Sequence, residues 1–225
     1  MKRNSALTAI IVLFSVIINI GKPLEATWHT GELALFDNVT LKGDLSYNWS
    51  AEMVLLRQPN GHIRTYSAYQ VRQFEWFDFA QSKQRKFVSL SRELADKRPN
   101  QTFYEICMNG SLPVIRRLKR PHGLFKRAFN HPNHYNDTQQ LAQNMDYFEY
   151  FVYDDGQFLA LDRFYTDIYE PRLASYDREL QTYMRNHNIN ERSLLGRIVL
   201  ISQYNFLEQE NQKTASNRST DIAPE

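Results

Sequence analysis

Four short polar pairs of residues constrain the fold of this chain more than any other feature. Each pair separates two runs of strand-forming residues, and the pairs are Asp37-Asn38, Asn60-Gly61, Asn109-Gly110 and Asp155-Gly156. Asn, Asp and Gly tolerate the positive φ angles that tight turns between antiparallel strands require. The sequence therefore predicts a β-hairpin at each of these pairs.

The runs beside these turns make up most of the predicted sheet. The hairpins join 32–36 to 40–47, 53–57 to 62–67, 102–108 to 112–118 and 147–153 to 157–164, and two more strand-like runs cover 70–77 and 85–90. Apolar and polar residues alternate over 41–48, as in an antiparallel sheet with one solvated face. About ten strands in such hairpins predict a mainly β fold, arranged as a barrel, a sandwich or a strongly curved sheet.

The character of the sequence changes near Pro171, after which helical periodicity replaces the strand pattern. Two helices are predicted, over 173–187 and 191–207, and in the second Leu194, Leu195, Ile198 and Ile201 recur at spacings of three and four. Asn190 is the predicted cap of the second helix, since its side chain can accept from an unpaired N–H of the first turn.

These patterns suggest one β domain with a helical appendage. The β domain is expected to cover 27–170, including an irregular loop at 119–142 that is rich in Pro, Asn and Gln. The helices of 171–210 are expected to pack on it, and the polar residues 211–225 predict a disordered tail.

The first 26 residues have the pattern of an export signal. Lys2 and Arg3 precede an apolar run over 6–20, and Ala26 offers a small residue at a cleavage point. The apolar run is shorter than the roughly 20 residues that a spanning helix needs. A cleaved signal at 1–26 predicts a periplasmic or secreted protein, and the alternative is a membrane protein anchored through 6–20.

Charge and cysteine content narrow the classes of function. Residues 1–26 hold three of the 27 Lys and Arg residues and one of the 25 Asp and Glu residues, so the rest carries 24 of each. A balanced chain of this kind argues against nucleic acid as a partner, because such binding depends on a basic surface. Cys107 is the single cysteine, which excludes an internal disulfide, and its place within a predicted strand suggests a buried, unreactive thiol.

A cluster of cations at the end of one predicted strand is the main candidate site. It consists of Arg116, Arg117, Lys119, Arg120, Lys126 and Arg127. Arginine side chains match phosphates and carboxylates in geometry, so the cluster could bind a lipid phosphate, an acidic glycan or the carboxylates of an envelope protein. The alternative is that these cations keep an edge strand solvated and prevent strand addition.

No metal or cofactor is predicted. His122, His131, His134 and Asp137 lie in the irregular loop, and His131, His134 and Asp137 have a spacing that would place them on one side of a helix. Pro132 interrupts such a helix, and no zinc-protease motif is present.

A carbohydrate-active hydrolase is the alternative function. Glu75 and Asp78 flank Trp76, and a pair of carboxylates beside a sugar-stacking ring is what glycoside hydrolysis uses. Residues three apart on a strand point to opposite faces, however, which argues against a shared site. No nucleophile motif or phosphate-binding glycine loop supports another enzyme class, so no catalytic residue is predicted.

Part of the sequence carries a resemblance. The residues are Gly31, the run Leu41-Lys42-Gly43-Asp44-Leu45-Ser46-Tyr47-Asn48, the run Tyr66-Ser67-Ala68-Tyr69-Gln70-Val71, and Phe74. Through them the chain resembles a group of exported, β-rich proteins of uncharacterised function from Bacteroidota-type bacteria. The resemblance implies a location in the cell envelope and a β fold, and it supplies no activity. The sequence thus predicts a non-enzymatic envelope protein that binds a partner or serves a structural role.

Overall fold

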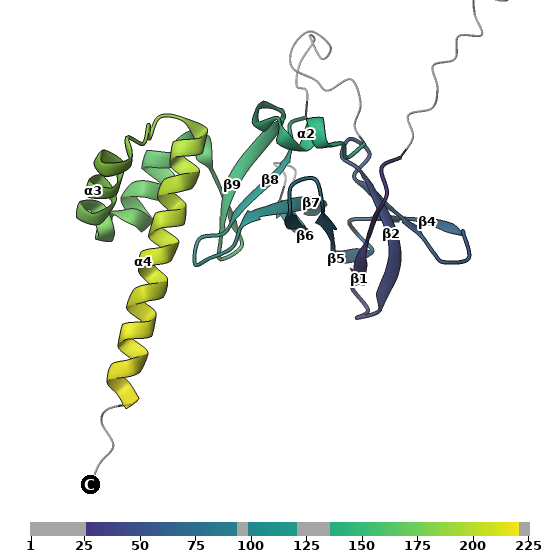
Figure 1. The fold of residues 1–225 in the computed structure, drawn as a ribbon, viewed down its shortest axis with the longest axis horizontal. Helices are drawn as coiled ribbons and strands as arrows, with labels where there is room; N and C mark the ends of the chain where they lie inside the picture. Colours follow the sequence, from purple (N-terminus) through teal and green to yellow (C-terminus); the bar gives the residue numbers. More distant parts are fainter. Residues whose placement is uncertain (1–25, 94–98, 121–135, 221–225) are drawn as a thin grey trace, which may run out of the picture.

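The computed structural model describes residues 26–93, 99–120 and 136–220. They form one antiparallel sheet of ten strands in the order β10-β9-β8-β7-β6-β5-β1-β2-β3-β4, with a helical part beside β9 (Figure 1). The strands are β1 (His29–Leu35), β2 (Thr40–Asn48), β3 (Met53–Arg57), β4 (Ile63–Ser67), β5 (Val71–Asp78), β6 (Lys83–Glu93), β7 (Pro99–Met108), β8 (Val114–Leu118), β9 (Phe148–Asp154) and β10 (Gln157–Ala160).

The prediction of a mainly β fold is confirmed. Each predicted hairpin is present with antiparallel register, and the turn residues Asn38, Gly61, Gly110 and Gly156 all have positive φ. Of the three predicted arrangements, the structure has the curved single sheet, which is not closed because β10 and β4 lie at opposite ends of the strand order. β10 ends at Ala160, four residues before its predicted end.

Two glycines allow the close packing of neighbouring strands at this end of the sheet. Gly31 pairs directly with Gly43 across β1 and β2. A Cβ atom on Gly31 would lie 2.2 Å from the backbone oxygen of Glu75, and one on Gly43 would lie 2.5 Å from that of Arg57. No side chain fits at these distances, so Gly31 permits the close approach of β1 to β5, and Gly43 permits that of β2 to β3.

The main hydrophobic core lies on one face of the sheet, called here the core face. Its centre is a cluster of aromatic rings on neighbouring strands: Tyr47, Trp49, Phe74, Trp76, Phe87, Phe103 and Phe148. Tyr47, for example, contacts Phe74 at 5.3 Å and Phe103 at 5.8 Å between ring centroids. Such ring pairs contribute about 0.5–1.5 kcal/mol each beyond the area that they bury.

The opposite face, called here the second face, carries a smaller core. Tyr104, Ile115 and Phe151 are buried there, with Phe158 of β10 packed against them. Both faces of β7–β9 are therefore covered, and this half of the sheet differs from the one-sided pattern that alternation predicts for residues 41–48.

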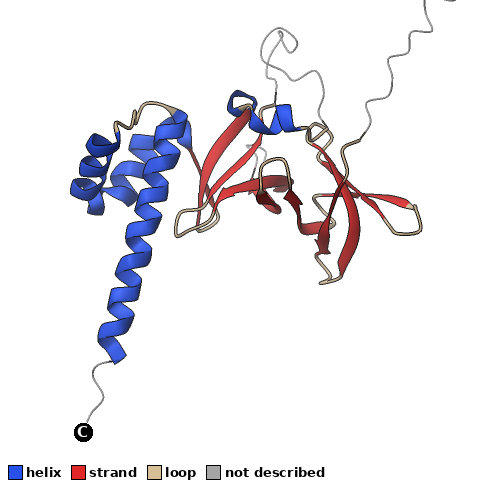
Figure 2. Cartoon of the chain, in the orientation of Figure 1, coloured by secondary structure: helices blue, strands red, loops and turns tan. Residues whose placement is uncertain are grey.

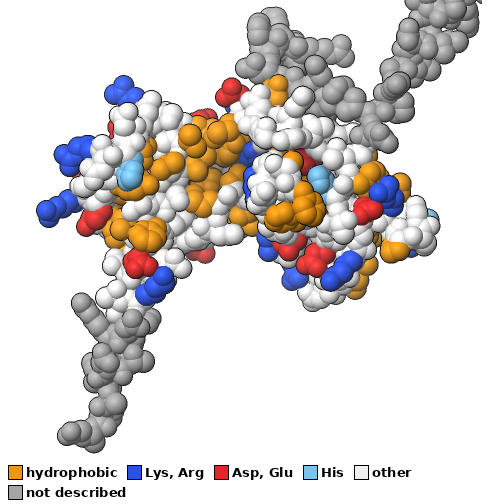
Figure 3. All heavy atoms as spheres, in the orientation of Figure 1, with side chains coloured by type: hydrophobic (Ala, Val, Ile, Leu, Met, Phe, Trp, Pro, Cys, Tyr) orange, Lys and Arg blue, Asp and Glu red, His pale blue; other side chains and the backbone are white. Residues whose placement is uncertain are grey.

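The helical part begins directly after β10 (Figure 2). It consists of η2 (Leu161–Arg163), the π-helix η3 (Phe164–Leu173), η4 (Ala174–Tyr176), α3 (Asp177–His187) and α4 (Leu194–Thr220), and two short helices, α2 (Gln139–Gln143) and η1 (Met145–Tyr147), precede β9. Its buried side chains, such as Ile168 and Leu200, join the main core. On the face drawn in Figure 3, hydrophobic side chains gather where the helical part meets the sheet.

Both predicted C-terminal helices are present, with different boundaries. The regular part of the first begins at Asp177 rather than at residue 173, because η3 and η4 precede it. The second begins at Leu194, and its cap is Ser193, whose Oγ accepts from the N–H of Gly196 at 3.0 Å. Asn190 instead accepts from Arg192 in the turn before the helix, so its prediction as the cap was wrong.

The prediction of a disordered tail from residue 211 was also wrong, since α4 continues to Thr220. The predicted signal at 1–26 lies, apart from Ala26, outside the described residues, as does most of the loop at 119–142. Within the described part of the chain, no helix has the length and apolar character needed to cross a membrane.

Candidate functional site

The six cations of the predicted anion site do not share one surface. Successive side chains of a strand point to opposite faces, and accordingly Arg116 of β8 lies on the core face while Arg117 lies on the second face. β8 pairs with β7 on one side and with β9 on the other, so it is an interior strand rather than the edge strand of the alternative interpretation. Lys126 and Arg127 lie outside the described residues.

Arg116 belongs to a buried network of charges on the core face. Glu105 of β7 is its centre and accepts from Arg116 Nε at 2.8 Å and from Arg85 Nε at 2.8 Å. Arg116 also donates to the carbonyl of Ala142 and lies 4.1 Å above the ring of Phe148. Because Arg116 is 5% exposed and its Nη2 also lies 2.6 Å from Glu105, it is not available to an external anion.

Asp137 completes this network from the far end of the irregular loop. Its carboxylate accepts from Arg85 Nη1 at 2.6 Å and from the indole nitrogen of Trp49 at 2.8 Å. Asp137 is 2% exposed, and its own N–H donates to the carbonyl of Tyr47. Asp137 therefore fixes the returning chain to the sheet, which accounts for its carboxylate without a metal.

The electrostatics of the network favour its charged form. Burial would raise the pKa of Glu105, but the charges and hydrogen bonds of Arg85 and Arg116 outweigh it and hold this pKa below its usual value. Burial would likewise lower the pKa of Arg85, yet Glu105 and Asp137 raise it above the usual range. A buried ion pair is costly unless it is well hydrogen-bonded, and here the two arginines donate to both Glu105 oxygens.

Arg117 and Lys119 line a pocket on the second face together with Arg92 of β6. This second-face pocket has a volume of about 340 Å³. Its lining residues are Arg92, Arg117, Lys119, Phe148, Glu149, Tyr150, Phe151, Ala160, Leu161, Asp162 and Leu194. Two of the six predicted cations are thus brought together, with a third cation that the sequence interpretation missed.

Aromatic rings and a carboxylate position the cations of the second-face pocket. Arg92 lies 5.3 Å above the ring of Phe151, and Arg117 lies 5.8 Å from the same ring. Arg117 also pairs with Glu149 at 2.9 Å, while the Lys119 side chain is exposed. Cations over aromatic faces keep their charge and are held in a defined place, as an anion site requires.

Arg120 lies elsewhere, because it pairs with Glu52 in the turn between β2 and β3. His122, His131 and His134 lie outside the described residues. Among the residues that the structure describes, no group of three or more His, Cys, Asp or Glu side chains is arranged to hold a metal ion.

The carboxylates of the alternative hydrolase do not share a site. Asp78 lies on the core face, where it is 5% exposed and accepts from the backbone N–H groups of Ala80 and Gln81 in a turn. Glu75 lies on the second face beside Lys86. Trp76 is 1% exposed and cannot stack on a sugar. No observation in this region supports glycoside hydrolysis.

Cys107 is more exposed than its prediction as a buried thiol, but the prediction of an unreactive thiol agrees with its pKa, which burial of the sulfur and the charge of Glu105 raise to about 12. It lies in β7 between Ile106 and Met108, where the register with β8 shifts, and its side chain is exposed. A shift in register re-aims the side chain locally, which period-two alternation does not anticipate.

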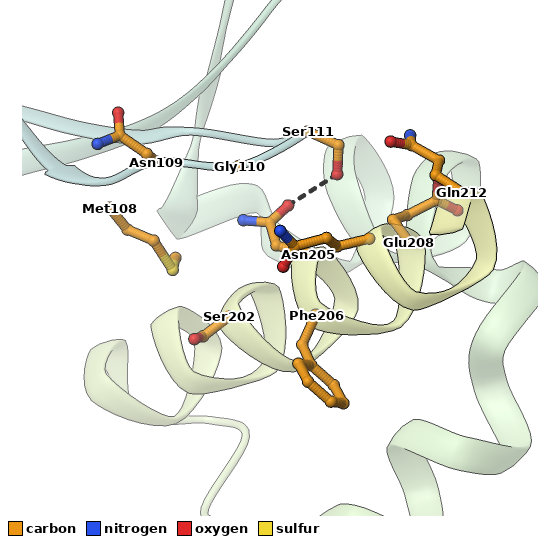
Figure 4. Close-up of a pocket in the computed structure, with 10 residues that line it drawn as sticks. Met108, Asn109, Gly110, Ser111, Ser202, Asn205, Phe206, Glu208 and Gln212 are labelled. Carbon is orange, nitrogen blue, oxygen red and sulfur yellow. Dashed lines mark hydrogen bonds between the residues drawn. The ribbon is translucent and has the colours of Figure 1, made fainter. Parts of the chain in front are cut away.

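A second pocket, of about 460 Å³, lies between the β7–β8 turn and α4 (Figure 4). Asn205 of α4 points to the turn, where it accepts from the Ser111 hydroxyl at 2.9 Å and from the Leu112 N–H at 2.8 Å. It also donates to the Leu112 carbonyl at 3.0 Å. These bonds tie the turn to the helix, so Asn205 has a structural role in this pocket.

Comparison of the chain with protein families, with curated proteins and with solved structures gave no match. The candidate function therefore depends on the geometry described above.

Proposed function

We propose that this protein is a non-enzymatic binding module of the cell envelope, and that its ligand is an anion held in the second-face pocket. The observation that supports this proposal most is the convergence of Arg92, Arg117 and Lys119 on one pocket. The pocket also contains the carboxylates Glu149 and Asp162, so its formal charge is positive by one. The envelope location rests on the pattern of residues 1–26.

The ligand would carry carboxylate or phosphate groups. Charge-assisted hydrogen bonds from arginine and lysine to such groups contribute about 1.5–3 kcal/mol each. Part of the attraction is long-range and is screened by salt, with a Debye length of about 10 Å at 0.1 M ionic strength. Binding should therefore weaken as salt is added.

The test is calorimetric titration of the protein with hexaglutamate and with pyrophosphate. The double variant Arg92→Gln/Lys119→Gln should bind at least about tenfold more weakly, because it removes two charged donors and leaves the Arg117–Glu149 pair in place. Arg64→Gln is the matched control, since Arg64 is exposed on β4 at the other end of the sheet. Equal affinity of the double variant and the control would refute the proposal.

A further inference from the structure

Strand β4 forms one edge of the sheet, and its outer side has no partner among the described residues. The strand order ends at β4, which pairs only with β3, from Met53 opposite Ser67 to Arg57 opposite Ile63. The β3–β4 hairpin extends from the end of the sheet that lies far from the helical part (Figure 1). The side chains of 63–65 are exposed, with Ile63 at 47%, so no part of the described chain covers this edge.

One hydrogen bond of the hairpin shows which backbone groups face outward. Gln58 N–H donates to the His62 carbonyl at 2.9 Å, so these two opposite residues form a hydrogen-bonded pair. Hydrogen-bonded and non-hydrogen-bonded pairs alternate along an antiparallel ladder. Ile63 and Thr65 therefore direct their N–H and C=O groups away from β3, and no described residue bonds to these groups. Four backbone groups are thus open to an added strand.

The open stretch has a cation at its centre. Ser67 ends the stretch, because its N–H donates to Gln70 Oε1 at 3.0 Å and its carbonyl accepts from the Gln70 N–H at 3.0 Å. Arg64 lies between the two open residues, is exposed, and has no ion-pair partner among the described residues. An antiparallel pairing of two copies that used all four open groups would place Arg64 opposite its own copy, which is unfavourable. The charge therefore argues against a second copy and favours a strand that carries an acid.

We propose that the outer edge of β4 binds an extended acidic segment of another protein, which adds to the sheet as an antiparallel strand. Two residues of the segment form hydrogen-bonded pairs with Ile63 and Thr65, as in other cases of strand addition. An acidic residue between them lies opposite Arg64, where the Cα atoms of a non-hydrogen-bonded pair are about 4.5 Å apart. Tyr66 is buried in the main core, so Ile63 lies on the second face, where apolar side chains of the segment cover it.

This edge is separate from the second-face pocket and uses its charge differently. Main-chain hydrogen bonds and apolar contact hold the strand, whereas a single exposed ion pair adds little affinity and instead selects the partner. Hexaglutamate has no apolar residue to cover Ile63, and glutamate is depleted in strands. It therefore does not fit this edge, and Arg64→Gln remains a valid control for the anion site.

Peptides test strand addition directly. The probe is a blocked pentapeptide with glutamate at its centre, a valine on each side and a threonine at each end. One variant carries N-methyl groups on both valines, whose N–H groups face β4. The matched control carries an N-methyl group on the glutamate, whose N–H faces away from β4.

The parent peptide and the control should bind with similar affinity and should protect the Ile63 and Thr65 amides from hydrogen exchange. The valine-methylated peptide should bind at least about tenfold more weakly, because it cannot donate either main-chain hydrogen bond. Equal binding by the two methylated peptides, or no protection of either amide by the parent, would overturn strand addition.

Variants of the protein give a second test. Thr65→Pro removes an outward N–H that the fold does not use, and proline is tolerated on an edge strand at such a position. It should weaken binding of the parent peptide at least about threefold, while Thr65→Val, which keeps the N–H, should bind as the unchanged protein does. A dimer of the protein alone that Thr65→Pro abolishes would overturn the proposal by assigning the edge to a second copy.

Exchange of charge tests the acidic character of the partner. Arg64→Glu should weaken binding of the parent peptide at least about threefold, and a peptide with lysine in place of glutamate should restore it. Absence of this rescue would overturn the assignment of an acidic partner.

Discussion

At the scale of single residues, the most consequential group is Glu105. It is 2% exposed and joins Arg85 to Arg116 at the centre of the core face. Removing one partner of such a buried pair typically costs about 3–5 kcal/mol, because the remaining charge is left without compensation. Side chains two apart on a strand share a face, so Arg85 points inward with Phe87, and Glu105 points inward with Phe103. Alternation along the two strands therefore predicts that Arg85 and Glu105 lie on the same face of the sheet.

Stability should fall in acid because of Glu105. Its pKa in the folded protein lies below the usual value of 4.5, so its contribution is complete above that value and is lost as the pH falls through the lower folded pKa. Urea unfolding measured between pH 7 and pH 3 should show this loss.

Two variants distinguish the loss of stability in acid that is due to Glu105 from the loss that is due to other carboxylates. Glu105→Gln should be destabilised at pH 7 and should show a shallower loss of stability in acid. Asp44→Asn is the matched control, because Asp44 also pairs with an arginine, Arg57, but its side chain is 36% exposed. Such surface pairs contribute about 0–1 kcal/mol. If Asp44→Asn reduced the loss of unfolding free energy between pH 7 and pH 3 as much as Glu105→Gln does, the acid sensitivity could not be attributed to Glu105.

At the scale of elements, the turn residues made the hairpins predictable. Where no such residues mark a boundary, as at η3 and at the end of β10, the predicted boundaries are wrong. Asn38 and Gly156 adopt the positive φ angles that their residue types favour. No comparable signal marks the π-helix η3, which contains Pro171, so the sequence predicts a strand that ends at 164 and a helix that begins at 173, with neither over 165–172. The end of β10 at Ala160 likewise carries no turn signal in the sequence, which predicts a strand up to 164.

Helix α4 should stabilise the β7–β8 hairpin through one side chain. Asn205→Ala removes the bonds to Ser111 and to both backbone groups of Leu112, and it should cost about 1–3 kcal/mol, since the partners are partly buried. Gln209→Ala, one turn further along α4 at an exposed position, should change stability by less than about 0.5 kcal/mol. Thermal unfolding of both variants checks the comparison, and equal midpoints would exclude this role for Asn205.

At the scale of the whole molecule, the order of strands in the sheet could not be predicted from the sequence. Hairpins specify which neighbours pair, but they do not specify that β1 lies between β5 and β2. The same limit applied to the site: Arg92 and Lys119 are 27 positions apart in the sequence, and they reach one pocket because β6 and β8 both pair with β7. The predicted cluster counted cations that are close along the chain, whereas the pocket selects those that share a face.

The first 26 residues give a prediction at this scale. Export with cleavage after Ala26 would produce a protein that begins at Thr27, two residues before β1 begins at His29. Mass spectrometry of the N-terminus after cell fractionation should find this form in the periplasm or the medium. Recovery of intact Met1 in the membrane fraction would show that residues 6–20 act as an anchor instead.

The attachments on either side of residues 121–135 have a consequence for the evolution of this sheet. Arg120 is fixed to Glu52, while Asn136 and Asp137 are fixed to Asn48 and Trp49, so both attachments meet at one corner of the sheet. Lengthening a chain between two fixed points costs only loop-closure entropy, about 0.6 kcal/mol for each doubling. The fold therefore offers an insertion point at which new sequence can be acquired with little loss of stability.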